Sequence, residues 1–181
     1  MRWTEFALLF LCLACGVEPQ PESARTVAAF EVPLPSAPER AEFLALIGAV
    51  AEVEGLHVDA ADAEDLRRLS EIAPMTIHAA VWRGPNDDES VASIEDLPDN
   101  LGRAWITFAR GEDPALVTRF RERAMRRIFE RWPSTQSLPI MPSGVIPLPA
   151  DLRLTPQGYR VRPDAAARYE LPPGSPLIAQ E

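Results

Sequence analysis

The sequence contains no lysine, because all 18 of its basic residues are arginine. Without a lysine amine, the chain has no Schiff-base residue for pyridoxal phosphate, no P-loop lysine and no lysine base of a serine hydrolase. Both cysteines, Cys12 and Cys15, lie near the N-terminus. We therefore expect no disulfide, no thiol nucleophile and no cysteine metal site in the rest of the chain, although an oxidising compartment would allow a disulfide.

Common catalytic motifs are also missing. The sequence has no G-x-S-x-G nucleophile elbow, no G-x-G-x-x-G loop, no H-E-x-x-H pair and no EF-hand loop. We therefore predict no cofactor. The net charge is −9, and an acidic protein is repelled by phosphate backbones, so nucleic acid is not expected as a partner.

The first fifteen residues are the most informative part of the chain. Arg2 precedes an uncharged run from Phe6 to Cys15, and small residues follow. This is the layout of a secretory signal. The run is about ten residues long, whereas a helix that crosses a bilayer needs about 20. The sequence therefore predicts export without a transmembrane anchor.

The end of this run resembles a bacterial lipoprotein signal. In that family a leucine, two small residues and an invariant cysteine form the lipobox. Here Ala14 and Cys15 occupy the last two positions and Gly16 follows, whereas Cys12 and Leu13 stand where the family has a leucine and a small residue. The resemblance implies that Cys15 is lipidated and becomes the new N-terminus. Since no aspartate follows Cys15, it also implies anchoring to the outer membrane, facing the periplasm.

A second interpretation of the same residues stays open. Ordinary signal cleavage after Gly16 would remove both cysteines and release a soluble periplasmic or secreted protein. The chain divides into a signal at residues 1–16, a polar segment at 17–25 that serves as a tether under the lipoprotein interpretation, a core at 26–132 and a proline-rich segment at 133–181.

The core shows alternating helix and strand patterns. Apolar residues at helical spacing predict helices, and β-branched or aromatic residues in alternation predict strands. Ser36, Asp59 or Asp62, and Asp113 are candidate N-caps. The predicted helices cover 38–54, 62–73 and 113–132, and the strands cover 26–34, 56–58, 76–84, 90–94 and 103–111. The strands at 76–84 and 103–111 look alike and are expected to be neighbours, and residues 86–89 read as an exposed turn.

The proline-rich segment contains a second predicted unit. Thr155-Pro156-Gln157-Gly158 is a typical turn sequence between two short strands, and a short helix is expected at 164–169. The whole pattern predicts an α+β fold: a two-layer sandwich of a mainly antiparallel sheet with two to three helices, of which a ferredoxin-like order is one possibility. The C-terminal segment adds a β-hairpin.

Three residues are candidates for metal binding or acid/base catalysis. His57 and Asp59 lie on the same face of a predicted strand, and His78 could approach them, with Asp62 or Glu64 as further ligands. A metal site needs three or four ligands. The alternative is that His57 ends a strand and Asp59 caps a helix.

Arginines concentrate on the predicted helix at 113–132. Arg119, Arg123, Arg126 and Arg127 lie mostly opposite its apolar stripe, where they could bind an acidic partner, a lipid phosphate or a cell-wall carboxylate. The alternative is a solvated face whose arginines pair with acidic residues of the same chain.

Aromatic residues offer a further candidate surface. Alternation places His78, Trp82, Trp105 and Thr107 on the sheet face opposite the aliphatic side chains, where they would form an exposed patch unless the C-terminal segment covers it. Residues 137–149 could bind a partner as an extended segment or pack on the domain itself.

Two functions follow from these candidates. The first is a non-enzymatic, membrane-anchored envelope protein that binds a protein or cell-wall partner. The second is a small periplasmic hydrolase or metal-dependent enzyme that uses His57, Asp59 and His78.

Overall fold

The computed structural model describes residues 21–84 and 90–180, and the turn expected at 86–89 lies outside them. Within this part of the chain, six strands form one sheet in the order β2-β3-β4-β5-β1-β6, and all neighbours are antiparallel. The predicted mainly antiparallel sheet is thus confirmed. The strands are β1 (Thr26–Pro33), β2 (His57–Ala60), β3 (His78–Trp82), β4 (Ser90–Glu95), β5 (Arg103–Ala109) and β6 (Gln136–Ser137).

The strand order differs from two expectations. The similar strands β3 and β5 are not neighbours, because β4 lies between them. The elements follow the order β1-α1-β2-α2-β3-β4-β5-α3-β6, whereas a ferredoxin-like fold has the order β-α-β-β-α-β. Consecutive strands joined by short connections pair as an antiparallel meander, and this preference places β4 in the middle of the sheet.

Three helices connect the strands, and each begins where the sequence predicts. They are α1 (Ala37–Val53), α2 (Ala63–Ser70) and α3 (Pro114–Arg131). The side chains of Ser36, Asp62 and Asp113 each accept a hydrogen bond from a backbone N–H of the first turn. Such a bond satisfies a donor that the helix itself leaves unpaired.

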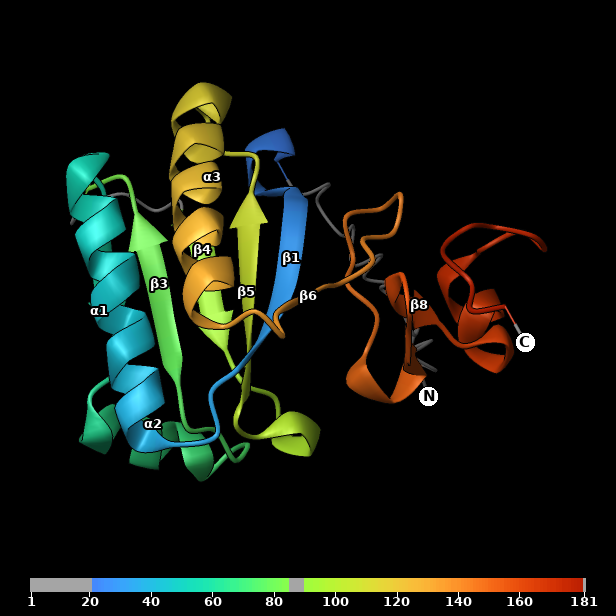
Figure 1. Cartoon of the computed structure of the whole chain (residues 1–181), viewed down its shortest axis with the longest axis horizontal. Helices are drawn as coiled ribbons and strands as arrows, with labels where there is room; N and C mark the ends of the chain where they lie inside the picture. The colour runs from blue at the N-terminus through green and yellow to red at the C-terminus, as the bar shows by residue number, and fades with distance from the viewer. Residues whose placement is uncertain (1–20, 85–89, 181) are drawn as a thin grey trace, which may run out of the picture.

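Helices α1 and α3 lie side by side on one face of the sheet (Figure 1). Their apolar stripes and the inward residues of the strands form the main core. Its largest fully buried side chains include Phe43, Ile47, Ile77, Ile94, Ile106, Phe108, Phe120 and Ile128. The alternation predicted for β5 is confirmed, since Ile106 and Phe108 point into this core.

Helix α2 does not pack into this core. The apolar spacing predicts that Leu66, Leu69 and Ile72 face inward, but no residue of α2 is buried, and Ile72, beyond its last turn, is 88% exposed. The helix connects β2 to β3 at one end of the sheet (Figure 1). Ion pairs of Arg67 and Arg68 with Glu64 lie on its exposed surface. An amphipathic pattern predicts a helix, but not whether a partner element is near enough to cover its apolar face.

A buried carboxylate fixes the entry into β3. Asp96 is 1% exposed, and its oxygens accept bonds from the backbone N–H of Thr76 at 2.7 Å and of Ile77 at 3.2 Å. The N–H of Gly102 donates to the same carboxylate at 3.2 Å. Asp96 thereby ties together the segments that precede β3 and β5, and its own charge is satisfied by these donors.

The C-terminal segment forms the predicted hairpin. Strands β7 (Leu152–Thr155) and β8 (Gly158–Val161) pair antiparallel across Pro156 and Gln157. Gly158 follows the turn at a φ of 95°, a conformation that side chains other than glycine rarely adopt. The short helix expected at 164–169 is present as the 3-10 helix η4 (Pro163–Tyr169). Further 3-10 turns are η1 (Glu22–Ala24), η2 (Pro98–Asn100) and η3 (Pro149–Asp151).

The same segment packs on the body of the protein. It lies beside β1, at the opposite side of the sheet from α1 (Figure 1). Leu138 is 5% exposed and packs with Ala29 and Trp105 on the sheet face opposite the helices. Met141 and Val161 belong to a separate small cluster within the segment. Residues 137–149 therefore pack largely on the chain itself, which was one of the two interpretations of their sequence.

Candidate binding surfaces

The sheet face opposite α1 and α3 is only partly covered. The C-terminal segment shields the half formed by β1 and β5, whereas the half formed by β2, β3 and β4 carries half-buried or exposed side chains. The strand register places these side chains on one face. They are His57 and Asp59 on β2, His78, Ala80 and Trp82 on β3, and Ser93 and Glu95 on β4.

The three residues considered for metal binding do not converge. His57 pairs with Trp82 and Asp59 with Ala80, whereas His78 pairs with Glu95 on the other side of β3. Four positions along β3 separate the two histidines, a distance of about 13 Å. Within residues 21–84 and 90–180, no group of three or more His, Cys, Asp or Glu is arranged to hold a metal ion.

His78 makes a weak contact with Glu95. Its Nδ1 lies 3.9 Å from Oε2 of Glu95, too far for a hydrogen bond, and this ring nitrogen is buried without another partner in the structure. Both side chains remain more than 40% exposed. The His78–Glu95 pair is therefore a surface contact rather than a built site.

The two tryptophans expected in one patch have different environments. Trp82 is half-buried on the open half of the face, but Trp105 is only 6% exposed. Leu138, with Tyr159 beside it, packs against Trp105. For Trp105 the structure shows the second alternative, cover by the C-terminal segment, whereas His78, Trp82 and Thr107 keep partial exposure.

A pair of hydroxyls lies beside a hollow where this open half meets β5. Oγ of Ser93 and Oγ1 of Thr107 are 2.7 Å apart on the neighbouring strands β4 and β5. The hollow has a volume of about 480 Å³, and Ser90, Thr26 and Ala109 also line it. We refer to the surface formed by His78, Trp82, Ser93 and Thr107 as the open strip.

Glu31 is the most heavily bonded side chain beneath the C-terminal segment, and sequence reasoning missed it. The residue is 3% exposed. Its Oε1 accepts bonds from Nε of Arg103 and the hydroxyl of Tyr159, both at 2.7 Å. Its Oε2 accepts bonds from Asn100 at 2.7 Å and from Trp105 at 3.3 Å. The only sequence signal is a glutamate in the middle of an otherwise apolar strand.

The Glu31 carboxylate changes the titration of two of these partners. Burial raises the pKa of the Tyr159 hydroxyl, and the hydrogen bond and negative charge of Glu31 raise this pKa further. Burial alone would lower the pKa of Arg103, but the hydrogen bond and charge of Glu31 outweigh that effect and raise it. Because every oxygen of the carboxylate is bonded, the cluster holds the hairpin to the sheet rather than offering a free acid or base.

The arginine face of α3 is partly neutralised by the chain itself. Arg119 and Arg123 contact Glu54, the C-cap residue of α1, at 3.4 and 3.0 Å. Arg131 pairs with Glu42 of α1 at 2.6 Å. Arg126 and Arg127 are exposed. The structure thus supports internal pairing for half of the predicted cationic face and leaves the other half to solvent.

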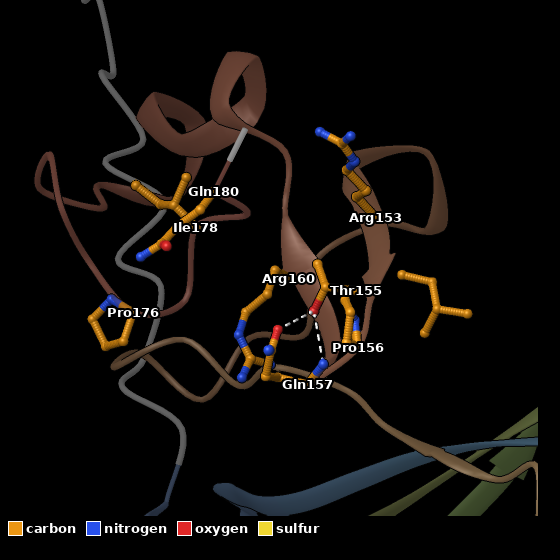
Figure 2. Close-up of a pocket in the computed structure, with 9 residues that line it drawn as sticks. Arg153, Thr155, Pro156, Gln157, Arg160, Pro176, Ile178 and Gln180 are labelled. Atoms are coloured by element: carbon orange, nitrogen blue, oxygen red, sulfur yellow. Dashed lines mark hydrogen bonds between the residues drawn. The ribbon is translucent and has the colours of Figure 1, made fainter.

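A second hollow lies on the C-terminal hairpin (Figure 2). It has a volume of about 390 Å³ and is lined by polar and apolar side chains. Oγ1 of Thr155 accepts a bond from the backbone N–H of Gln157 at 3.2 Å, which shapes the turn at one end. Arg153 and Arg160 lie on the two strands that form its floor.

Comparisons with known protein families, curated proteins and solved structures found no match to this chain. None of the helices in the part of the chain that the structure describes has the length and hydropathy needed to span a membrane.

Proposed function

We propose that this chain is an exported cell-envelope protein, lipid-anchored at Cys15, with a non-enzymatic role in binding or assembly. The anchor rests on the resemblance of residues 12–16 to a lipoprotein signal. The anchor would hold the protein at the outer membrane, facing the periplasm, where it would bind an envelope protein or a cell-wall polymer.

The observation that carries the binding role is the half-covered sheet face. The C-terminal segment buries Trp105 and Ala29 but stops short of Trp82, Ser93 and Thr107. Trp82 is the register partner of Ser90, one of the residues that line the hollow. A half-exposed tryptophan and nearby hydroxyls suit a recognition surface, because the ring supplies contact area and the hydroxyls supply directed bonds. The open strip is therefore the surface to which we assign the partner.

The anchor is tested by the intact mass of the protein from the membrane fraction. The wild-type chain should begin at Cys15 with added acyl mass, and Cys15→Ala should abolish this product. Cys12→Ala is the matched control, since it changes the other cysteine of the same segment and should leave the lipid in place. A mature protein that begins at Val17 without added lipid would contradict the anchor and support soluble export.

The binding surface is tested separately by crosslinking in intact cells. Trp82→Ala should reduce crosslinked products at the open strip, because it removes the largest half-exposed ring there. Phe129→Ala provides the control, since Phe129 is an aromatic residue of 42% exposure on the helical side. Equal crosslinking by both variants and wild type would exclude the open strip as the binding surface.

A further inference from the structure

The β7–β8 hairpin places two arginines directly opposite each other. Arg153 and Arg160 are register partners on its two strands. The Cβ atoms of such cross-strand partners are about 5 Å apart, and like charges in this position destabilise the pair. A sequence with only 18 basic residues in all thus places two of them opposite each other on a hairpin whose two strands have four residues each.

Neither arginine is neutralised within the part of the chain that the structure describes. Among residues 21–84 and 90–180, the arginines near them do have acidic partners: Arg162 pairs with Asp164 and Arg168 with Asp151. Arg153 and Arg160, by contrast, form no ion pair with any acidic residue in these two ranges. Arg160 donates from Nη1 to the backbone oxygen of Tyr159 at 2.8 Å.

The hollow beside the two arginines suits an anion with an apolar part. Among the residues that the structure describes, no acidic residue lines it. Figure 2 shows Arg160 extending toward Gln157 at one end, while Arg153 rises from the neighbouring strand at the other. Gln157 and Gln180 add amide donors, and Pro176 and Ile178 form an apolar wall. Guanidinium groups bind carboxylates through paired N–H bonds.

We propose that this hollow is a binding site for a small organic carboxylate. The carboxylate accepts bonds from Arg160 and the Gln157 amide, Arg153 supplies a second positive charge, and the carbon skeleton packs on Pro176 and Ile178. The ligand relieves the repulsion between the two arginines, so binding and hairpin stability are coupled. This site goes beyond the proposed function and requires neither the lipid anchor nor the open strip.

The test is isothermal titration calorimetry of the purified, processed protein at low salt. The probes are glutarate, which stands for a free dicarboxylic acid, and an acetylated glutamyl dipeptide, which stands for a peptide carboxylate. Saturable binding of either probe at roughly millimolar concentration is expected. Arg160→Gln should weaken it by about tenfold or more and Arg153→Gln by several-fold.

Arg162→Gln is the matched control, because Arg162 follows the same strand but is already paired with Asp164. It should leave binding unchanged. Removal of either opposed arginine relieves repulsion, so without ligand the melting temperatures of R153Q and R160Q should be no lower than that of the wild type. A loss of binding in these variants is then not caused by a loss of folding. The proposal is overturned if neither probe binds, if R160Q binds as well as wild type, or if inorganic phosphate binds as tightly as both carboxylates.

Discussion

Glu31 shows how one buried charge can join distant parts of a small protein. Its carboxylate lies on β1, two of its donors lie on β5, one on η2 and one on β8. A carboxylate removed from water is costly unless donors replace the lost hydration, and here four donors do so. The side chain thus stabilises one particular position of the hairpin on the sheet.

Replacement of Glu31 by glutamine should be strongly destabilising. The amide loses the charge that pairs with Arg103 and presents an NH₂ group to donors, so we expect a loss of about 2 to 4 kcal/mol in the free energy of unfolding. Glu52→Gln is the control, because Glu52 is exposed on α1, and it should change stability by less than about 0.5 kcal/mol. Denaturant titration measures both, and equal losses would contradict the role assigned to Glu31.

The two tyrosines of the chain should ionise at a higher pH in the folded protein than in the unfolded chain. Burial and a bond to a carboxylate raise the pKa of both Tyr159 and Tyr169, whose partners are Glu31 and Asp151. Unfolded tyrosines ionise near about pH 10. Above that pH the unfolded chain holds fewer protons than the folded one, so this contribution to stability is present below about pH 10 and is lost as the pH rises through the raised pKa values.

Absorbance at 295 nm measures this directly. In the folded protein, ionisation should begin only above the ordinary tyrosine range, and in guanidinium chloride it should return to about pH 10. Tyr159→Phe and Tyr169→Phe assign the two transitions. A folded titration curve that coincides with the unfolded curve would show that neither hydroxyl is held by its carboxylate.

At the scale of elements, the link from β5 to α3 depends on a glycine. Gly111 has a φ of 71°, and a Cβ at this position would lie 2.6 Å from Cγ2 of Val117, inside the core. Two separate penalties therefore oppose any other residue: the left-handed backbone conformation and the clash with a buried side chain.

Gly111→Ala should lower the free energy of unfolding by about 2 to 4 kcal/mol. Gly55→Ala is a close control, because Gly55 has the same φ of 71° but no atom within 4 Å of the added Cβ. It should lose only about 1 to 2 kcal/mol, the cost of the left-handed conformation alone. If thermal and denaturant unfolding give equal losses for both, then Val117 does not limit this turn.

Helix α2 illustrates why an element can be predicted while its environment is not. Its cap at Asp62 and its apolar spacing are local, and both predict the helix. Whether Leu66 and Leu69 become buried depends on the neighbours of the short strand β2, which lies at the edge of the sheet. α1 and α3 already fill the covered face, so α2 remains exposed.

At the scale of the whole molecule, the C-terminal segment behaves as a cover attached at a few points. Its contacts with the sheet include the two-residue pairing of β6 with β1, the backbone bond from Leu138 to Ala29, the packing of Leu138 on Trp105, and the bond from Tyr159 to Glu31. Segments held by few contacts open more readily than the core. The position of this cover decides which half of the sheet face is available for binding.

Tyr159→Phe should loosen this cover selectively. The variant removes one bond to a buried carboxylate and should cost about 1 to 3 kcal/mol. We expect faster hydrogen exchange in residues 136–161, with little change in α1. Tyr169→Phe is the control within the segment, because Tyr169 bonds to Asp151 rather than to the sheet. Uniformly faster exchange across the protein would mean that the segment and the sheet open as one unit.

The sequence by itself determined the features that depend on residues a few positions apart. Helix caps, apolar periodicity, the proline–glycine hairpin turn and the α+β class all follow from local bonding and spacing. The tertiary structure decided the strand order, the exposure of α2, the covering of Trp105 and the bonding of Glu31. The partners of Glu31 lie 69 to 128 residues away in the sequence. Such contacts form only when distant segments of the chain pack together. No local sequence pattern specifies which faces of the helices and strands become buried.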